Sequence, residues 1–306
     1  MASLHSKVKN ALDEARILVL GSQVLLGFQY RAFFEPGFEH LGRGERALEL
    51  VGLFALLATV GALFLPASRH RIVERGFDST RFHRFTMLVM RGVLLPFALG
   101  LSVDLAVAGN RIAGAWGGAL CGALTAAAAL AFWYGHFARR SRRRKEDPED
   151  RMEETPLEQR IVQVLTEARV VLPGAQALLG FQLAMVLMDA FARLPQPVQL
   201  VHLGSLGFVA LATIVLMSPA AYHRIVERGE DTERFHTFAS RMVLLGLALL
   251  GPGFCGDLYV VLRRAGYQRA ALPVAAAVLV VFYAAWFGAM VLVRRRVQPK
   301  LQRREA

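Results

Sequence analysis

The sequence predicts an all-α integral membrane protein in which eight transmembrane helices form two tandem, parallel four-helix repeats. The repeats are expected to be related by a pseudo-two-fold axis along the membrane normal. Three observations predict this fold class: the length of the apolar runs, a motif that recurs after half the chain, and the distribution of basic residues. The 306 residues are 55% hydrophobic, and the mean hydropathy is +0.39.

The apolar runs are as long as a bilayer is thick. Residues 47–67 contain one charged side chain, Glu49, and residues 114–137 and 272–293 contain no Asp, Glu, Lys or Arg. A helix needs about 20 mainly apolar residues to cross the hydrocarbon. The first 14 residues hold no apolar segment and no cleavage site, so we expect no secretory signal peptide and an uncleaved first helix that directs insertion.

A motif that occurs twice indicates a tandem duplication. Residues 70–83 read HRIVERGFDSTRFH and residues 223–236 read HRIVERGEDTERFH, with 11 of 14 positions identical. The second copy follows the first by 153 positions. The same offset relates further pairs: Glu14-Ala15-Arg16 with Glu167-Ala168-Arg169, Leu25–Gln29 with Leu178–Gln182, Asp104 with Asp257, and Trp133-Tyr134-Gly135 with Trp286-Phe287-Gly288.

Each copy is expected to contain four helices. In the first copy they span Ala15–Phe34, Ala47–Ala67, Thr86–Ala108 and Gly114–Phe137, and in the second Ala168–Met188, Leu200–Ala220, Ala239–Leu262 and Leu272–Val293. The predicted domains are therefore residues 1–138 and 161–306. Residues 139–160 between them carry a basic run (RRSRRRK) and an acidic run (EDPEDRMEE), which predict a solvated linker.

The distribution of Lys and Arg predicts the orientation. Of 36 such residues, eight lie in the loops after the first and third helices of each copy, and 28 lie on or near the opposite side. Cytoplasmic loops collect Lys and Arg, so both termini and the linker are expected in the cytoplasm. This asymmetry also explains the net charge of +12 without a nucleic-acid partner.

Three local patterns resemble a known family. Glu14-Ala15-Arg16, a first helix that reads Gly-x-Gln-x-Leu-x-Gly-Phe-Gln (residues 21–29) and a Pro-x-x-x-His-Arg loop (residues 66–71) are similar to an uncharacterised family of small bacterial membrane proteins, a domain of unknown function. The resemblance covers residues 14–109 and 167–266. It implies four helices per unit and the bacterial inner membrane, but no chemistry. Since this chain fuses two units, it also implies that a single unit would pair as a dimer.

The first helix of each copy carries polar side chains within its apolar run. At about 100° per residue, Arg16, Gln23 and Gly27 share one stripe, and Gln29 lies on another face. A buried amide must find a partner. Two interpretations remain: a polar pathway or ligand pocket, and hydrogen bonding between packed helices. The equivalent residues of the second copy are Arg169, Gln176 and Gln182.

Asp104 and Asp257 lie near the outer end of the third helix of each copy, one turn after Gly100 and Gly253. Carboxylates inside a membrane are costly and are candidates for function. We therefore hypothesise a cation or proton site at the outer mouth, although closeness to the interface would allow a hydrated side chain.

The repeated loop has three interpretations. In the first, its arginines pair with Glu74, Asp78 and lipid phosphate, while Gly76 ends a helical turn and Asp78 caps the next helix. In the second, the two loops meet and bind an anionic headgroup or metabolite. In the third, the histidines hold a metal or haem, but their spacing of 13 without Cys or HExxH gives no support. The residues are His70, Arg71, Arg75, Arg81, His83, His223, Arg224, Arg228, Arg234 and His236.

Catalytic motifs such as GxSxG, HExxH, a Walker loop or GxGxxG after a strand are absent, so an enzyme is the least favoured class, and no cofactor, metal or assembly state is assigned. Two functions remain. One is passage of a small solute or ion near the axis. The other is a non-transporting module whose loops bind anionic lipid or a cytoplasmic partner. A pathway requires Gln23 and Gln176 to face a hydrated cavity, whereas the module requires them to pack against helices.

Overall fold

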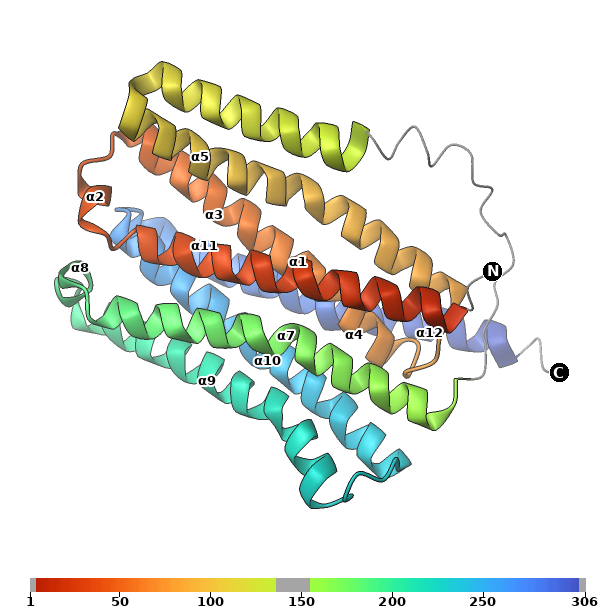
Figure 1. The fold of residues 1–306 in the computed structure, drawn as a ribbon. Coiled ribbons are helices and arrows are strands. Elements are labelled where there is room, and N and C mark those ends of the chain that lie inside the picture. The colour runs from red at the N-terminus through yellow and green to blue at the C-terminus, as the bar shows by residue number, and fades with distance from the viewer. Residues whose placement is uncertain (1–3, 136–154, 303–306) are drawn as a thin grey trace.

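The computed structural model describes residues 4–135 and 155–302, and each regular element in these ranges is a helix (Figure 1). The linker predicted at 139–160 lies outside the described residues up to 154, and its last residues, from Leu157, begin a helix. The first copy contains α1 (Leu4–Ala32), α2 (Pro36–Glu39), α3 (Arg43–Leu63), α4 (Leu65–Ile72), α5 (Thr80–Leu130) and η1 (Ala131–Gly135). The second contains α7 (Leu157–Val186), α8 (Asp189–Ala192), α9 (Gln196–Ile225), α10 (Glu233–Arg264), α11 (Gln268–Tyr283), η2 (Ala284–Gly288) and α12 (Ala289–Gln302).

The two copies repeat one order of elements. In each, a long first helix leads through a one-turn helix to a second and a third long helix, and the π-helical segments η1 and η2 coincide after a shift of 153 residues. The short helices α2 and α8 lie at one end of the bundle, opposite the loops that follow α4 and α9 (Figure 1). We call the end with residues 70–83 and 223–236 the linker end, and the end with α2 and α8 the short-loop end.

Helix α5 contains the third and fourth helices predicted for the first copy. The helix is interrupted at Ala113 (φ −126°, ψ 15°) and Gly114 (φ 71°, ψ −174°), where the chain turns back on itself (Figure 1). A positive φ favours glycine. Small residues let the two arms pack closely, since a Cβ on Gly118 would lie 2.7 Å from the carbonyl oxygen of Ala106. The sequence therefore predicted the two arms and the turn between them.

The copies meet through their equivalent first helices, α1 and α7. Phe28 and Phe181, which occupy equivalent positions, have ring centroids 4.4 Å apart. The contact is close because Gly27 lacks a side chain: a Cβ there would lie 2.1 Å from Cδ2 of Phe181.

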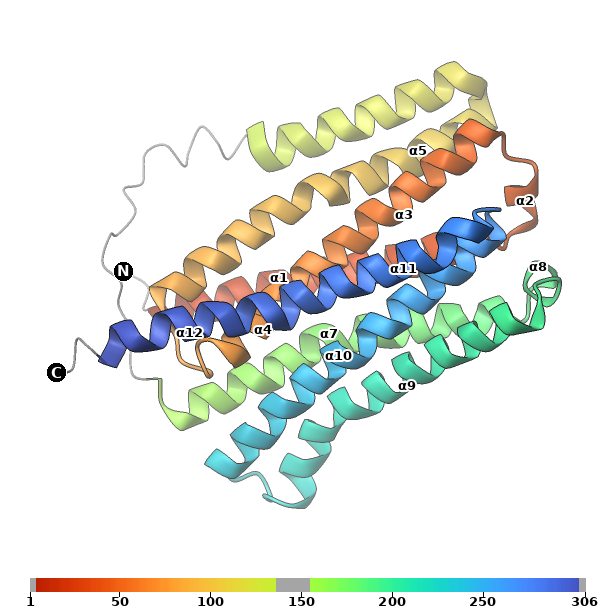
Figure 2. The ribbon, with the colours of Figure 1, turned by 180° about the vertical axis from the view of Figure 1, so that it is seen from behind.

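The fourth helix of the second copy packs against the second helix of the first. The indole Nε1 of Trp286 donates to the carbonyl oxygen of Gly61 at 2.7 Å, and the hydroxyl of Ser68 donates to the carbonyl oxygen of Trp286. Phe282 stacks on Trp286, and a Cβ on Gly61 would lie 2.4 Å from that phenyl ring. Figure 2 shows this helix lying across α10 and α3. The equivalent arm of α5 lies at the outside, and its Trp116 is 89% exposed.

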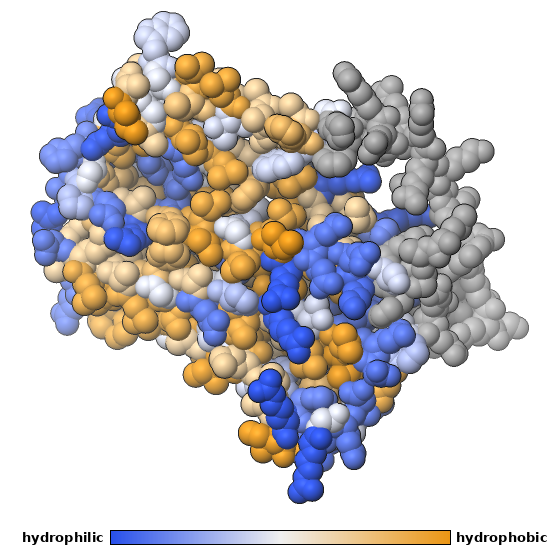
Figure 3. All heavy atoms as spheres, viewed as in Figure 1, coloured by the Kyte–Doolittle hydropathy of each residue, from blue (hydrophilic) through white to orange (hydrophobic). Residues whose placement is uncertain are grey.

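Six helices in the described part of the chain are long and apolar enough to cross a membrane. They are Arg43–Ile72, Thr80–Gly135, Leu157–Val186, Gln196–Ile225, Glu233–Arg264 and Gln268–Arg296. Many large apolar side chains on them face outward, which is typical of helices surrounded by lipid. Figure 3 shows hydrophobic residues over the middle of one face and hydrophilic residues towards both ends. These features agree with a membrane location.

Candidate functional site

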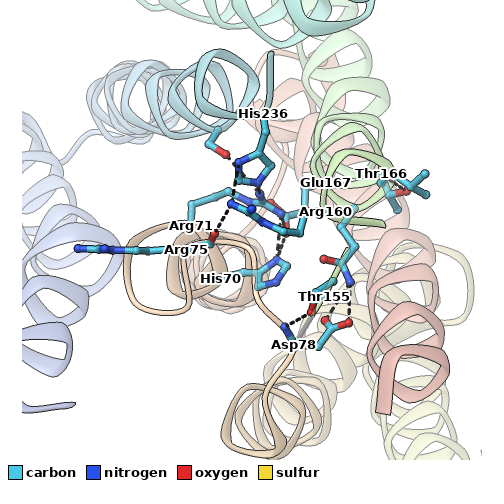
Figure 4. A network of polar contacts seen from close by, with 12 residues as sticks. His70, Arg71, Arg75, Asp78, Thr155, Arg160, Thr166, Glu167 and His236 are labelled. Atoms are coloured by element: carbon cyan, nitrogen blue, oxygen red, sulfur yellow. Dashed lines mark hydrogen bonds and ion pairs between the residues drawn. The ribbon is translucent and has the colours of Figure 1, made fainter. Parts of the chain in front are cut away.

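A buried ionic network at the linker end joins the two copies (Figure 4). Glu167 on α7 accepts hydrogen bonds from Arg71 on α4, at 2.5 Å from Nε and 2.8 Å from Nη2, and lies 2.5 Å from Nδ1 of His70. Arg71 also reaches His236 and Ser240 on α10, each at 3.3 Å. The His70, Arg71 and Glu167 side chains are buried, so this geometry resembles the two-pronged Arg–carboxylate pairing that is strong in proteins.

The turn after this network is also fixed by the second copy. Asp78 accepts both hydrogen bonds of the Gln163 amide, at 2.9 and 3.1 Å, and its backbone N–H donates to Thr155. Gly76, with φ 87°, ends the helical turn as predicted. The predicted cap was wrong: the hydroxyl of Ser79, and not Asp78, accepts from the N–H of Phe82, because the Asp78 carboxylate is engaged by α7.

The same motif in the second copy lies in a different environment. Arg224, Arg228 and Arg234 are exposed, and no ion pair within residues 4–135 and 155–302 engages them. His223 lies 3.6 Å from Asp231, a neighbour in the same loop. The backbone is nevertheless the same, since Arg228 and Gly229 repeat the positive φ of Arg75 and Gly76. The two loops therefore form the same backbone turn from nearly the same sequence, but their side chains contact different residues.

A groove of about 620 Å³ lies beside this second loop, between the last turns of α9 and the first turns of α10. Two arginines, Arg234 and Arg241, line it, and they are seven residues apart and therefore on one face of α10. Tyr222 and Phe238 stack at 4.5 Å and form an aromatic wall. The remaining lining residues are Glu233, Thr237 and Met242. Glu233 is paired with Arg160 at 2.7 Å, so the two arginines dominate the charge of the groove.

Each copy also holds a buried polar cluster near the short-loop end. In the second copy, Asp257 lies 2.7 Å from the amide of Gln182, 3.1 Å from the ring of His202 and 3.0 Å from the hydroxyl of Ser205. In the first copy, the amide of Gln29 donates to Glu49 at 2.7 Å and interacts with Asp104. The structure thus brings together Gln29 with Asp104 and Gln182 with Asp257, which the sequence identified as separate candidates.

The residues predicted for a central pathway are not gathered at one place. Gln23 is fully buried and packs on α7, since a Cβ on Gly174 would lie 1.4 Å from its Oε1. Arg16, Arg169 and Gln176 are exposed on the outer surface of the helices. Gln23 therefore fills a helix contact, as the non-transporting module requires, whereas Gln176 is exposed and does not pack against a helix as the module requires.

The loop histidines do not converge either. His70 and His236 both contact Arg71, whereas His223 lies by Asp231 and His83 is half-buried in its own copy. No group of three or more His, Cys, Asp or Glu that could hold a metal ion occurs among the described residues. Arg75 and Arg81 are exposed at the linker end.

Comparison with known proteins agrees with the duplication. The profile of a family of unknown function (DUF6328) matches residues 3–136 and, separately, residues 150–290. The chain belongs to this family. Two DUF6328 units in one chain confirm the predicted tandem duplicate of an uncharacterised domain. No curated protein and no solved structure matches this DUF6328 chain.

Sequence reasoning missed several residues of these sites, among them Glu49, Glu167, His202 and Tyr222. Glu167 had a signal, since Glu14-Ala15-Arg16 and Glu167-Ala168-Arg169 are repeated. Glu49 and His202 are equivalent by position but differ in type, so a search for identical residues at the 153-residue offset passes over them.

Proposed function

We propose that this chain is a bacterial inner-membrane protein whose second copy binds the phosphate headgroup of an anionic lipid in the groove between α9 and α10. The linker end faces the cytoplasm, and eight segments cross the bilayer: α1, α3, the two arms of α5, α7, α9, α10 and α11. Binding of lipid, and not passage of a solute, is the function that the arrangement of polar residues supports best.

The eight-span topology is supported by lengths and charges. The turn at Gly114 divides Thr80–Gly135, one of the six long apolar helices, into two arms, and α1 is 29 residues long. Counting the two arms separately and adding α1 brings the six helices to eight segments. Phe28 and Phe181 touch each other from equivalent positions, which is expected on a pseudo-two-fold axis between α1 and α7. Basic residues are concentrated at the linker end, which supports a cytoplasmic location for that end.

The observation that carries the proposal is the unequal use of two nearly identical loops. In the first copy, Arg71 is buried and binds Glu167 of the other copy. In the second copy, Arg224 is exposed, and the residue equivalent to Glu167 is Glu14, which is also exposed. One motif therefore places Arg71 between the copies, and the other leaves its equivalent, Arg224, exposed at the end of the membrane helices.

The chemistry of the groove fits a lipid phosphate. Two arginine side chains supply the donors that phosphate oxygens accept, and the Tyr222–Phe238 wall suits the boundary between headgroup and acyl chain. Met242 lies on the apolar side of the same groove. Basic residues close to an anionic leaflet contribute about 1 kcal/mol each.

The test is retention of phosphatidylglycerol by the solubilised full chain, measured by native mass spectrometry. Replacing both Arg234 and Arg241 by Gln removes two cations, so binding should weaken by about 2 kcal/mol, or roughly thirtyfold. The matched control is Arg43→Gln with Arg269→Gln, which removes the same charge from exposed positions at the short-loop end. The control should retain lipid as the wild type does.

Equal retention by both double variants would contradict the groove as the binding site. Displacement of the lipid by inorganic phosphate, without acyl chains, would assign the groove to a free anion. If inorganic phosphate does not displace the lipid and the Arg234 and Arg241 double variant loses it, the groove binds the lipid headgroup.

A further inference from the structure

The two polar clusters near the short-loop end are equivalent sites of the two copies, and they differ in the residues that the second helix contributes. The shared members are a Gln on the first helix and an Asp on the third. The differing members lie on the second helix. The equivalent pairs are Gln29 with Gln182, Glu49 with His202, Gly52 with Ser205, and Asp104 with Asp257.

The second copy pairs its carboxyl group with a histidine. The Nε2 of His202 faces the backbone carbonyl of Gln182 at 3.1 Å, and its Nδ1 faces Asp257 at 3.1 Å. A carbonyl only accepts a hydrogen bond, so Nε2 donates to it, and a second proton lies between Nδ1 and the Asp257 carboxyl group. His202 and Asp257 are each 1% exposed, and together they form a neutral pair.

The first copy has a second carboxyl group in the place of that histidine. Glu49 occupies the position of the imidazole and is 9% exposed, and its carboxylate accepts from Gln29 at 2.7 Å. Asp104 adjoins it: a Cβ on Gly52 would lie 3.4 Å from Oδ1 of Asp104 and 3.2 Å from Nε2 of Gln29. No ion pair within the described residues joins Glu49 or Asp104 to a basic side chain, so two ionised carboxylates would face each other in a largely apolar surrounding.

The groups packed around the pair do not neutralise it. On α3, Glu45 lies one turn nearer the short-loop end and adds a third carboxylate, which accepts from the N–H of Gly42 at 2.8 Å and from the amide of Asn110 on α5. On α1, the neighbouring Arg31 is paired with Glu35 at 2.9 Å, and the hydroxyl of Tyr30 donates to α10. Gln29 is neutral. Two buried like charges at one site are strongly disfavoured, and a shared proton removes one of them.

We propose that Glu49 and Asp104 together hold one exchangeable proton, in the place where the second copy shares a proton between His202 and Asp257. The proton comes from water at the short-loop end, with Glu45 as the first acceptor, and converts one of the two carboxylates to a carboxylic acid. No electron transfer and no further reactant are involved. In the second copy, the equivalent Gln and Asp surround His202, and the His202–Asp257 contact requires a proton between the two side chains, which supports a proton at the same place in the first copy.

The test uses infrared spectroscopy of the full chain in lipid bilayers, which detects the C=O stretch of protonated carboxyl groups. Above about pH 6, exposed Asp and Glu side chains are ionised, so the wild type should show one protonated carboxyl group that disappears as the pH is raised further. Glu49→His, which recreates the second copy's pair, should remove that signal. His202→Glu, which recreates the first copy's pair, should add a second one.

Asp13→Asn, at an exposed position near the linker end, is the control and should leave the signal unchanged. A wild type without any protonated carboxyl signal above pH 6 would overturn the proposal regardless of how the variants fold. A signal that persists in folded Glu49→His would overturn it as well. If sodium ions remove the signal at constant pH, the site binds a metal cation instead of a proton.

Discussion

At the residue scale, Glu167 is the clearest case of a side chain whose role is set by its partner. It is 1% exposed and binds both His70 and Arg71 of the other copy. Its equivalent, Glu14, has the same two following residues, Ala and Arg, but is exposed. The same sequence therefore produces a buried ion pair in one copy and a surface carboxylate in the other.

Replacing Glu167 by Gln should destabilise the protein strongly. The change leaves Arg71 as a buried charge without its counter-ion, and breaking a buried pair in this way costs about 3–5 kcal/mol. The measurement is the thermal unfolding midpoint of the solubilised chain. Glu14→Gln is the matched control, and as a surface change it should cost less than about 0.5 kcal/mol. Equal midpoints for the two variants would argue against the network of Figure 4.

A carboxylate at the short-loop end links the copies on the surface. Glu39 accepts from Arg264 at 2.6 Å and from Arg193 at 2.7 Å. The hydrogen bond from Arg264 and the charge of Arg193 lower the pKa of Glu39 below its usual 4.5. A carboxyl group whose pKa is lower in the folded state stabilises that state above the unfolded pKa, and this contribution is lost as the pH falls through the folded pKa.

The unfolding midpoint should therefore fall less between pH 7 and about pH 3 in Glu39→Gln than in the wild type, by a small amount because the site is exposed. Glu35→Gln serves for comparison, since Glu35 pairs only with Arg31 of its own copy among the described ion pairs. An identical acid response of wild type and Glu39→Gln would contradict the link.

At the element scale, the pair α1 and α7 departs from strict equivalence. Gln23 packs on Gly174, but the equivalent partner, Gly21, has no atom within 4 Å of a Cβ placed on it. Gln176 is correspondingly exposed. The two helices are therefore displaced from the positions that an exact two-fold would give them, and one of two equivalent contacts is made.

This difference provides a matched pair of substitutions. Gly174→Ala forces the Gln23 side chain to move and should destabilise the chain by about 1–3 kcal/mol, which is typical of overpacking. Gly21→Ala meets open space and should be neutral or stabilising by up to about 1 kcal/mol, because Ala favours a helix over Gly. Both are read from the thermal midpoint. A larger loss from Gly21→Ala than from Gly174→Ala would contradict the packing.

Local features were predictable from the sequence because they depend on residues close in the chain. The turn at Gly114, the αL turn at Gly76 and the repeated order of helices follow from glycine and from apolar length. The unequal surroundings of His70 and His223 were not predictable, because they depend on which helix of the other copy arrives there. The Glu49–Asp104 site was half predicted, since Asp104 and Gln29 repeat exactly but Glu49 does not.

At the scale of the whole molecule, the topology can be tested with single cysteines. The native thiols, Cys121 and Cys255, are replaced by Ala, and one Cys is introduced at exposed Arg228 or exposed Arg269. A membrane-impermeant thiol reagent applied to intact cells should label the Cys at 269 and not the Cys at 228. Label on both, or on the Cys at 228 alone, would contradict a cytoplasmic linker end.

Passage of a solute or ion stays a prediction at this scale. Its proposed residues do not surround one space: Gln23 is buried between helices, while Arg16 and Arg169 are exposed. Flux into liposomes that contain the protein is the relevant measurement. Transport that survives Gln23→Leu but is lost in Asp104→Asn would move the pathway from the axis to the first copy's carboxylates.

The contact between Trp286 and Gly61 has a consequence for the order of events during synthesis. A chain is synthesised from its first residue onward, so Gly61 is made long before Phe282, whose ring occupies the space beside it, and before Trp286, which donates to its carbonyl oxygen. Until α11 and η2 have been made, the surface of α3 at Gly61 lacks the Phe282 and Trp286 side chains that cover it in the complete chain. A nascent chain halted after residue 264 should therefore carry an incomplete first copy, even though every residue of that copy has been made.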